Sequence, residues 1–195
     1  LRDQLGGEIV VVSLCNNPVM NVIKKPMAMG SDELVLLQDP AFEGGDAYTT
    51  AKILAAAAEK IGDYDVILTG RQAGDWDNGQ VGSYVAAFLD IPCIINIGDL
   101  NVSDGKIRGD RTTADGREVI EAQLPALLTA GDEVGVARYP KLRDIMAAGR
   151  KQPLIWNSQD LGLDPATVGD SGALTKVRRL YVEEKVSQVE IIEGD

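Results

Sequence analysis

The sequence has 195 residues, 45% of them apolar, and its 30 acidic against 19 basic side chains give a formal net charge of −11. It has no histidine and two cysteines, so it offers no Ser-His-Asp or Cys-His relay, no structural zinc site and no iron–sulfur cluster. So few cysteines also favour a reducing compartment. The acidity argues against a nucleic-acid or anionic-membrane surface, because phosphate binding depends on clustered lysine and arginine. The length suits one domain with an appendage, or two small domains.

Residues 1–97 alternate between strand-like and helix-like segments. Four short, apolar, β-branched runs predict buried strands: residues 8–14, 33–37, 64–69 and 93–97. Three segments with helical spacing of apolar residues predict helices between them: residues 18–29, 46–61 and 81–89. Asp46 and Gly62 are the expected cap and stop of the middle helix. Strands that alternate with helices predict an α/β fold with a doubly wound parallel sheet.

The pattern changes after Gly98. Asp104-Gly105 and Asp115-Gly116 lie between alternating segments, so residues 98–123 are predicted to form a small β-hairpin insertion. Two further strands and a short helix are predicted after it: residues 124–129, 133–136 and 141–151. We assign residues 1–151 to one α/β domain.

Residues 152–195 are rich in turn residues and are expected to form an extended C-terminal arm rather than a second core. Two β-like pieces are predicted within it, at residues 177–182 and 186–192. Its last acidic residues are expected to be solvated surface: Glu183, Glu184, Glu190, Glu193 and Asp195. The sequence shows neither a signal-peptide core nor an apolar run long enough to span a membrane. We therefore expect a cytoplasmic protein, or one of the mitochondrial matrix if the source is eukaryotic.

The most informative stretch is residues 70–82, GRQAGDWDNGQVG, which follows a predicted strand and opens a helix. Ligands of α/β sheets bind beyond the carboxyl ends of the strands, and the free N–H groups of a helix start suit a phosphate. Gly79 and Gly82 would let the backbone approach a ligand, and Gln80 could donate its side-chain amide. Asp77 could accept from a sugar hydroxyl. The alternative is that Asp77 or Asn78 only caps the helix, since the stretch matches neither a Walker loop nor a GxGxxG fingerprint.

Four motifs together resemble the beta subunit of electron-transfer flavoproteins over nearly the whole chain. They are Ala28-Met29-Gly30-Ser31-Asp32; Gly44-Gly45-Asp46 with Ala51-Lys52-Ile53-Leu54-Ala55; Gly70-Arg71-Gln72-Ala73 with Asp75, Asp77, Gln80, Val81 and Gly82; and residues 137–146, ARYPKLRDIM. The combination is specific where each motif alone is not. The resemblance implies a sheet of the adenine nucleotide alpha hydrolase-like type. It also implies an electron carrier subunit without catalytic residues of its own.

The resemblance implies a heterodimer, in which an alpha subunit holds a redox-active FAD and receives electrons from acyl-CoA or related dehydrogenases. The family's beta subunit binds a nucleotide of its own, AMP in simple carriers and a second FAD in electron-bifurcating members. At the matching positions this cofactor site comprises Ser13, Leu14, Gly70, Gln72, Asp77, Asn78, Gly79, Gln80, Val81 and Gly82. The C-terminal arm is expected to contact the alpha subunit. Neither a metal site nor a nucleic-acid partner is expected.

Two positions depart from the family pattern. Asn16-Asn17 replace the usual Gly-Pro after the first strand, and Trp76 stands where a small or acidic residue is common, so the pocket rim is expected to be unusual. Residues 80–82 and residues 172–177, GALTKV, look somewhat more like the bifurcating or nitrogen-fixation-type branch. AMP and a second FAD both put an adenine and a phosphate at the same helix start, so the loop does not separate them.

The family's beta subunit begins with a strand and a helix that precede the strand at Glu8, and that first strand lies centrally in the sheet. The resemblance therefore predicts that a first βα unit is missing from this sequence. Without it, the strands at residues 8–14 and 64–69 would lack a shared neighbour and leave unpaired edges.

Residues 137–150 correspond to the family's recognition segment, in which a leucine docks into a pocket on the partner dehydrogenase. Leu142 is the matching residue, and Arg138, Tyr139 and Ile145 are further candidates for partner binding. An apolar anchor ringed by polar residues is typical of a binding hot spot. The alternative is that Leu142 packs inward with Ile145 and Met146.

The rival function is a stand-alone adenine-nucleotide sensor of the universal-stress type, built on a related sheet. Such a protein would need neither residues 138–146 nor the long arm.

Overall fold

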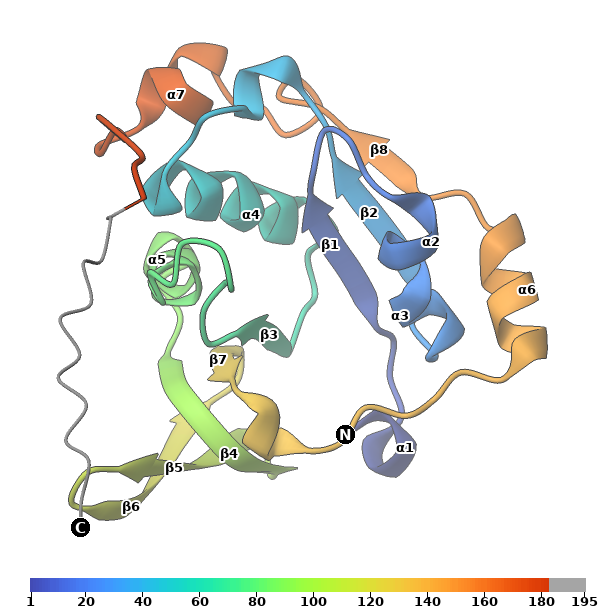
Figure 1. Ribbon diagram of the computed structural model, residues 1–195. Helices are drawn as coiled ribbons and strands as arrows, with labels where there is room; N and C mark the ends of the chain where they lie inside the picture. The colour runs from blue at the N-terminus through green and yellow to red at the C-terminus, as the bar shows by residue number, and fades with distance from the viewer. Residues whose placement is uncertain (183–195) are drawn as a thin grey trace, which may run out of the picture.

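The computed structural model describes residues 1–182, apart from the side chain of Thr112, and these residues form an α/β structure with two sheets (Figure 1). The strands are β1 (Val10–Leu14), β2 (Glu33–Leu37), β3 (Val66–Gly70), β4 (Cys93–Ser103), β5 (Lys106–Thr113), β6 (Gly116–Gln123), β7 (Ala126–Ala130) and β8 (Leu154–Trp156). The helices are α1 (Arg2–Leu5), α2 (Met20–Ile23), α3 (Lys25–Ala28), α4 (Ala47–Ile61), α5 (Val81–Phe88), α6 (Leu142–Arg150) and α7 (Gly169–Gly172). Three short 3-10 helices are η1 (Pro40–Phe42), η2 (Asp132–Val134) and η3 (Pro165–Thr167). The predicted strand at residues 186–192 and the acidic residues after 182 lie outside the described residues.

The first sheet has the order β1-β2-β8, and all of its strands are parallel. The second has the order β3-β7-β4-β5-β6 and is mixed, because β3, β7 and β4 run parallel while β5 and β6 form an antiparallel extension. Asp104 and Gly105 both have positive φ and form the turn between β4 and β5, as their sequence predicts. β4 belongs to both parts of the second sheet, because its first residues pair with β7 and its later residues pair with β5. The pairing is irregular near Ile97, where one partner gives way to the other.

The predicted doubly wound arrangement appears as two separate sheets in residues 1–182. β1 pairs only with β2, and β3 pairs only with β7, so each of these strands has one unpaired edge. Both were predicted to be buried strands, and both are only partly buried; Leu68 in β3 is 54% exposed. The physical reason is that a strand at a sheet edge has a neighbour on one side only.

Helix α4 connects the two sheets. Ile53 and Ala57 pack against the first sheet, while Ala51 and Ala55 pack against α5 and Leu127 of the second. Its alanines allow this close approach on two sides. The helix begins and ends where its sequence predicts, with a capping box at Asp46 and a C-cap at Gly62.

Four segments differ from their predictions. The β-like piece expected at residues 177–182 forms no strand, because no neighbouring strand pairs with it among the described residues. The helix expected over residues 18–29 is broken into α2 and α3, because Pro26 has no N–H to continue the first helix. The prediction of a strand at residues 133–136 is wrong, since η2 forms there between Gly131 and Gly135. β8 was not predicted as a strand, yet it extends the first sheet beside β2. In residues 1–182, no helix combines the length and the apolar character that crossing a membrane requires.

Candidate functional site

The glycine-rich loop after β3 is an open, solvent-facing turn. Every residue from 71 to 80 is exposed, and Trp76 keeps 55% of its surface accessible. The amide of Arg71 donates to the carbonyl of Ala130 at 2.8 Å, which fixes the start of the loop on β7. The side chain of Gln72 donates to the carboxylate of Asp77, so two predicted site residues bind each other across the loop.

Helix α5 begins at the end of this loop without a side-chain cap. Its N-cap residue is Gln80, whose side chain makes no capping hydrogen bond, and its first turn carries no acidic residue. The alternative that Asp77 or Asn78 caps the helix is therefore wrong. The first N–H groups of a helix have no intrahelical partner and carry a partial positive charge. The start of α5 thus remains chemically able to bind an anionic group.

The two glycines of this helix start have different roles. Gly79 has a φ of +61°, a conformation that favours glycine, and an added Cβ would lie 3.6 Å from the Arg71 carbonyl oxygen. Gly82 is buried in the first turn of α5, where an added Cβ would lie 2.5 Å from Thr69 Oγ1 and 2.7 Å from Thr129 Cγ2. Gly82 therefore allows α5 to pack directly on the ends of β3 and β7.

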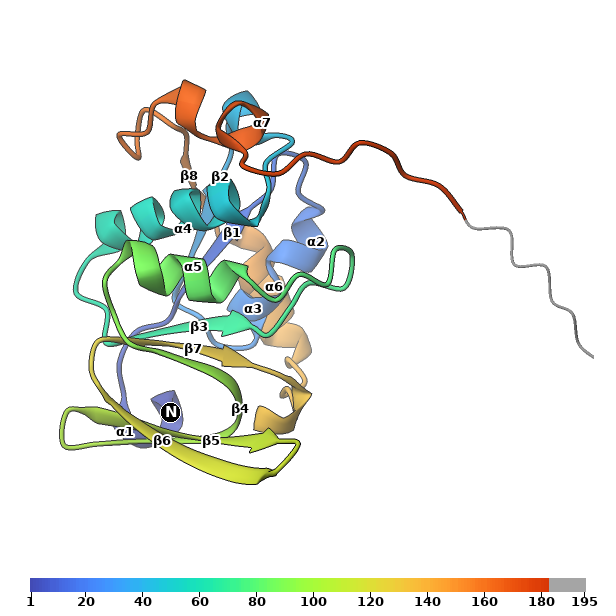
Figure 2. The same ribbon diagram turned by 90° about the vertical axis from the view of Figure 1, so that its left-hand side faces the viewer.

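Ser13 and Leu14 lie at the end of β1, in the other sheet. Figure 2 shows α2, which follows β1, and the loop that follows β3 on the same side of the molecule. No hydrogen bond between described residues joins Ser13 or Leu14 to the loop. Asn16, one of the departures from the family pattern, exchanges two hydrogen bonds of 3.0 Å with the backbone of Asp39 and so binds the segment after β2. The structure thus brings eight of the predicted cofactor residues together and places the other two on the neighbouring sheet.

The predicted partner segment is exposed on α6 and before it. Tyr139 is 94% exposed, Leu142 73% and Ile145 47%, so the alternative that Leu142 packs inward is wrong. Leu142, Arg143 and Met146 line a shallow depression together with Ala147 and Arg150. The inward residue of α6 is Ala148, which is 4% exposed and packs against Met27 and Leu34.

Both ends of this segment are attached to the α/β body, by which we mean the two sheets and the helices packed on them. At one end, Arg138 forms a 2.8 Å ion pair with Asp3 of α1. At the other end, Lys24 donates to the carbonyl of Gly149 at 3.1 Å, and Lys151 donates to the carbonyl of Asp32 at 3.2 Å. The outward face of α6 is therefore presented on a supported helix.

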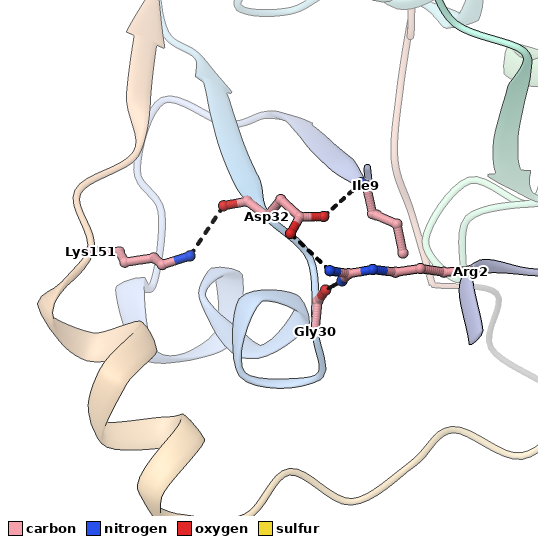
Figure 3. A network of polar contacts seen from close by, with 5 residues as sticks. All are labelled: Arg2, Ile9, Gly30, Asp32 and Lys151. Atoms are coloured by element: carbon pink, nitrogen blue, oxygen red, sulfur yellow. Dashed lines mark hydrogen bonds and ion pairs between the residues drawn. The ribbon is translucent and has the colours of Figure 1, made fainter. Parts of the chain in front are cut away.

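Asp32 is the centre of this support (Figure 3). Its carboxylate accepts from the amide of Ile9 at 2.9 Å and from the guanidinium of Arg2 at 3.0 Å, and Arg2 also donates to the carbonyl of Gly30. The network joins α1, the starts of β1 and β2, and the residue after α6. The Ala28 to Asp32 motif thus helps to hold α6, and with it the partner segment, in place.

Thr69 is a further candidate residue that no motif of the sequence indicates. Its hydroxyl oxygen is buried without a hydrogen-bond partner, directly beneath Gly82. The signal was present as a threonine at the end of a strand that leads into the glycine-rich loop, but only the packing of α5 gives it significance.

The comparisons with known proteins decide the family. Residues 1–161 match the electron transfer flavoprotein domain. The chain belongs to the electron transfer flavoprotein family. A family relative named electron transfer flavoprotein subunit beta, from Thermoanaerobacterium thermosaccharolyticum, is 39% identical over 91% of this chain and 68% of its own length.

Two further family relatives extend this result. The electron transfer flavoprotein subunit beta of Clostridium acetobutylicum is 36% identical over 99% of this chain and 74% of its own length. The caffeyl-CoA reductase-Etf complex subunit CarD of Acetobacterium woodii is 38% identical over 97% of this chain and 72% of its own length. The resemblance to beta subunits noted from the sequence motifs is confirmed, and the names of these relatives support electron transfer as the function.

Proposed function

We propose that this chain is the beta subunit of a heterodimeric electron-transfer flavoprotein. In this proposal an alpha subunit holds the redox-active FAD, and the present chain binds AMP or a second FAD. The observation that carries the proposal is the family match over residues 1–161, which includes the glycine-rich loop and the partner segment.

The chemistry of the α5 start fits a nucleotide phosphate. The uncapped N–H groups of α5 supply donors and partial positive charge, and Gly79 leaves the backbone accessible. We propose that Gly70, Gln72, Asn78, Gln80 and Val81 complete this side of the pocket. A flavin in the complex would supply the redox chemistry, whereas this chain's residues bind, orient and shield the bound nucleotide.

The partner segment and the arm are the proposed contacts with other proteins. We propose that Leu142 docks an acyl-CoA or related dehydrogenase, with Arg138, Tyr139 and Ile145 around it. Support for this comes from the exposed apolar face of α6 and from the attachments at both of its ends. We propose that the arm after Gln152 contacts the alpha subunit, and that the complex acts in the cytoplasm.

The predicted first βα unit and the predicted sheet type remain predictions. We propose that a further strand pairs with β1 and β3, each of which has a strand partner on one side only in residues 1–182. A sheet of the adenine nucleotide alpha hydrolase-like type would then be continuous.

The test is co-expression with a candidate alpha subunit, followed by gentle purification and a count of bound cofactors. We expect a yellow one-to-one complex that contains either one flavin with AMP or two flavins. Two flavins would make bifurcation the next reaction to assay, while one flavin with AMP would indicate a simple carrier. A colourless homodimer that retains ATP would contradict the proposal and support a nucleotide sensor.

A further inference from the structure

Residues 157–176 return along the α/β body and end at the N-terminus of α4 (Figure 1). Val168 is completely buried in the core with Val35 and Phe42. Beside it, the amide of Asp170 donates to the carbonyl of Glu43 at 2.8 Å. This part of the C-terminal arm is therefore packed onto the body and is not a free extension.

Glycines allow this close contact. Gly169 has a φ of +54°, and an added Cβ would lie within 2.7 Å of the Glu43 carbonyl oxygen and closer still to that of Ala41. On the facing loop, an added Cβ on Gly45 would lie 3.3 Å from the Gly169 Cα. The arm therefore packs directly against the Gly44-Gly45 pair before α4, which belongs to one of the four sequence motifs.

The final attachment of the arm is the carboxylate of Asp46. One oxygen of this carboxylate accepts from the amide of Thr49 at 3.0 Å, which caps α4. The other oxygen accepts from the arm, at 2.9 Å from the Leu174 amide, 2.8 Å from the Thr175 amide and 3.0 Å from the Thr175 hydroxyl. A single side chain therefore joins the start of α4 to a segment that lies 129 positions later in the chain.

The two carboxylate oxygens of Asp39 also have different partners, at the start of the arm. One oxygen accepts from the Ala41 amide at 2.9 Å, and the other accepts from the amide and the hydroxyl of Ser158. The hydroxyl of Ser158, together with these amides, holds the pKa of the Asp39 carboxyl below its usual value. Two aspartates thus attach the two ends of the returning segment.

Beyond Thr175 the chain leaves the body, as Figure 2 shows. Lys176 forms an ion pair with Asp170 at 3.1 Å, within the arm itself. Among described residues, no hydrogen bond joins residues 177–182 to the α/β body. The apolar side chains of this stretch are largely exposed, between 58% and 93%: Val177, Leu180, Tyr181 and Val182.

We propose that Asp46 is a positioning residue that sets the point at which the arm leaves the body and so presents residues 177–182 to the partner subunit. The identity of that partner, a flavoprotein alpha subunit, rests on the proposed function. The physical reason is entropic: a segment anchored immediately before its binding residues loses less conformational freedom on association than a segment with a distant anchor.

The test uses two variants that separate the arm from the helix cap. Thr175→Val removes one donor to Asp46 and leaves the bond to Thr49 in place. Asp46→Asn keeps a good N-cap for α4 but removes the charge on which three arm donors converge. Thr167→Val is the matched control, because its hydroxyl bonds only within the arm, to the carbonyl of Asp164.

The first readout is made on the full chain alone, by hydrogen exchange of the Leu174 and Thr175 amides and by trypsin cleavage after Lys176. We expect both rates to rise about tenfold in Thr175→Val, the effect of one lost charge-assisted hydrogen bond, and further in Asp46→Asn. Thr167→Val should leave them unchanged. Unchanged rates in Asp46→Asn would overturn the anchor itself.

The second readout is the affinity of each variant for the flavin-loaded alpha subunit. We expect the dissociation constant to rise about tenfold in Thr175→Val and not to change in Thr167→Val. An unchanged affinity despite faster exchange would show that Asp46 does not present the arm. If the wild-type chain does not bind the alpha subunit at all, the proposed function fails and the presentation step with it, while the exchange rates still decide whether the anchor exists.

Discussion

Gly82→Ala tests the link between the packing of α5 and the proposed nucleotide site. The new Cβ would lie 2.5 Å from Thr69 Oγ1 and 2.7 Å from Thr129 Cγ2, whereas ordinary contacts begin at 3.4 Å. Threonine side chains are stiff, and Thr129 is further held because its hydroxyl accepts from the Asn96 amide at 3.0 Å. The start of α5 must therefore move outward by about 0.9 Å, the difference between 3.4 and 2.5 Å.

The expected cost follows from this displacement. Overpacking of a tight contact destabilises a protein by about 1–3 kcal/mol, and the better helix propensity of alanine offsets up to about 1 kcal/mol. We expect the free energy of unfolding to fall by about 1–2 kcal/mol. We also expect nucleotide affinity to fall, because the N–H groups of the helix start move relative to the loop.

Gly74→Ala is the matched control in the same loop. Gly74 is exposed, and an added Cβ there meets no atom within 4 Å. Urea unfolding would measure stability, and titration calorimetry with AMP and with FAD would measure affinity. Equal results for the two variants would refute the packing argument. A destabilised Gly82→Ala that binds nucleotide normally would refute the placement of the site.

Three further predictions concern α6 and Asp46. Leu142→Ala should slow electron transfer from the partner dehydrogenase about tenfold or more without unfolding the chain, because Leu142 is 73% exposed; stopped-flow flavin reduction would measure this. Burial raises the pKa of Asp46, but hydrogen bonds from Thr49, Thr175 and Leu174 outweigh it and lower the pKa to about 2. Its carboxylate should therefore stabilise the fold fully above about pH 4, and this contribution, at most about 2 kcal/mol, should be lost as the pH falls from 4 towards 2 in acid unfolding curves. Gly149→Ala should raise the free energy of unfolding by up to about 1 kcal/mol, since its Cβ would meet no atom within 4 Å in α6, as chemical denaturation would show.

Each of these predictions has a control variant or an outcome that would contradict it. Val119→Ala removes a 52% exposed apolar side chain from β6 and should leave the electron-transfer rate unchanged; an equal loss in both variants would contradict docking at Leu142. Asp46→Asn should flatten the acid dependence between pH 4 and 2, and a dependence that persists in full would assign it to other carboxyls. A destabilised Gly149→Ala would show that α6 depends on more than helix propensity.

Local signals in the sequence were sufficient for most elements. The cap at Asp46 and the stop at Gly62 determine α4 because they act within one helical turn. Asp104-Gly105 determines the first hairpin because its two residues accept the positive φ of the turn. The glycine-rich stretch located the candidate site for the same reason, since a strand, a loop and a helix start are contiguous in the chain.

Elements that depend on a neighbour were missed. β8 has only the residues Leu154–Trp156, and its pairing with β2 makes it a strand. Residues 133–136 looked like a strand by composition, but η2 forms there and lies beside β4. Glu133 pairs at 3.8 Å with Arg71, which follows β3. In both cases the deciding partner lies far away in the sequence.

The amino-acid sequence by itself determined the α/β class, the family, the loop that opens α5 and the segment that carries Leu142. Only the tertiary structure decided that Gly82 lies against Thr69 and Thr129, that Leu142, Ile145 and Met146 of α6 are exposed, and that Asp46 binds Thr175. Capping and turn formation act over a few residues, so a sequence pattern records them. Packing and long-range hydrogen bonds depend on which distant groups come together, and no local pattern in the chain records that.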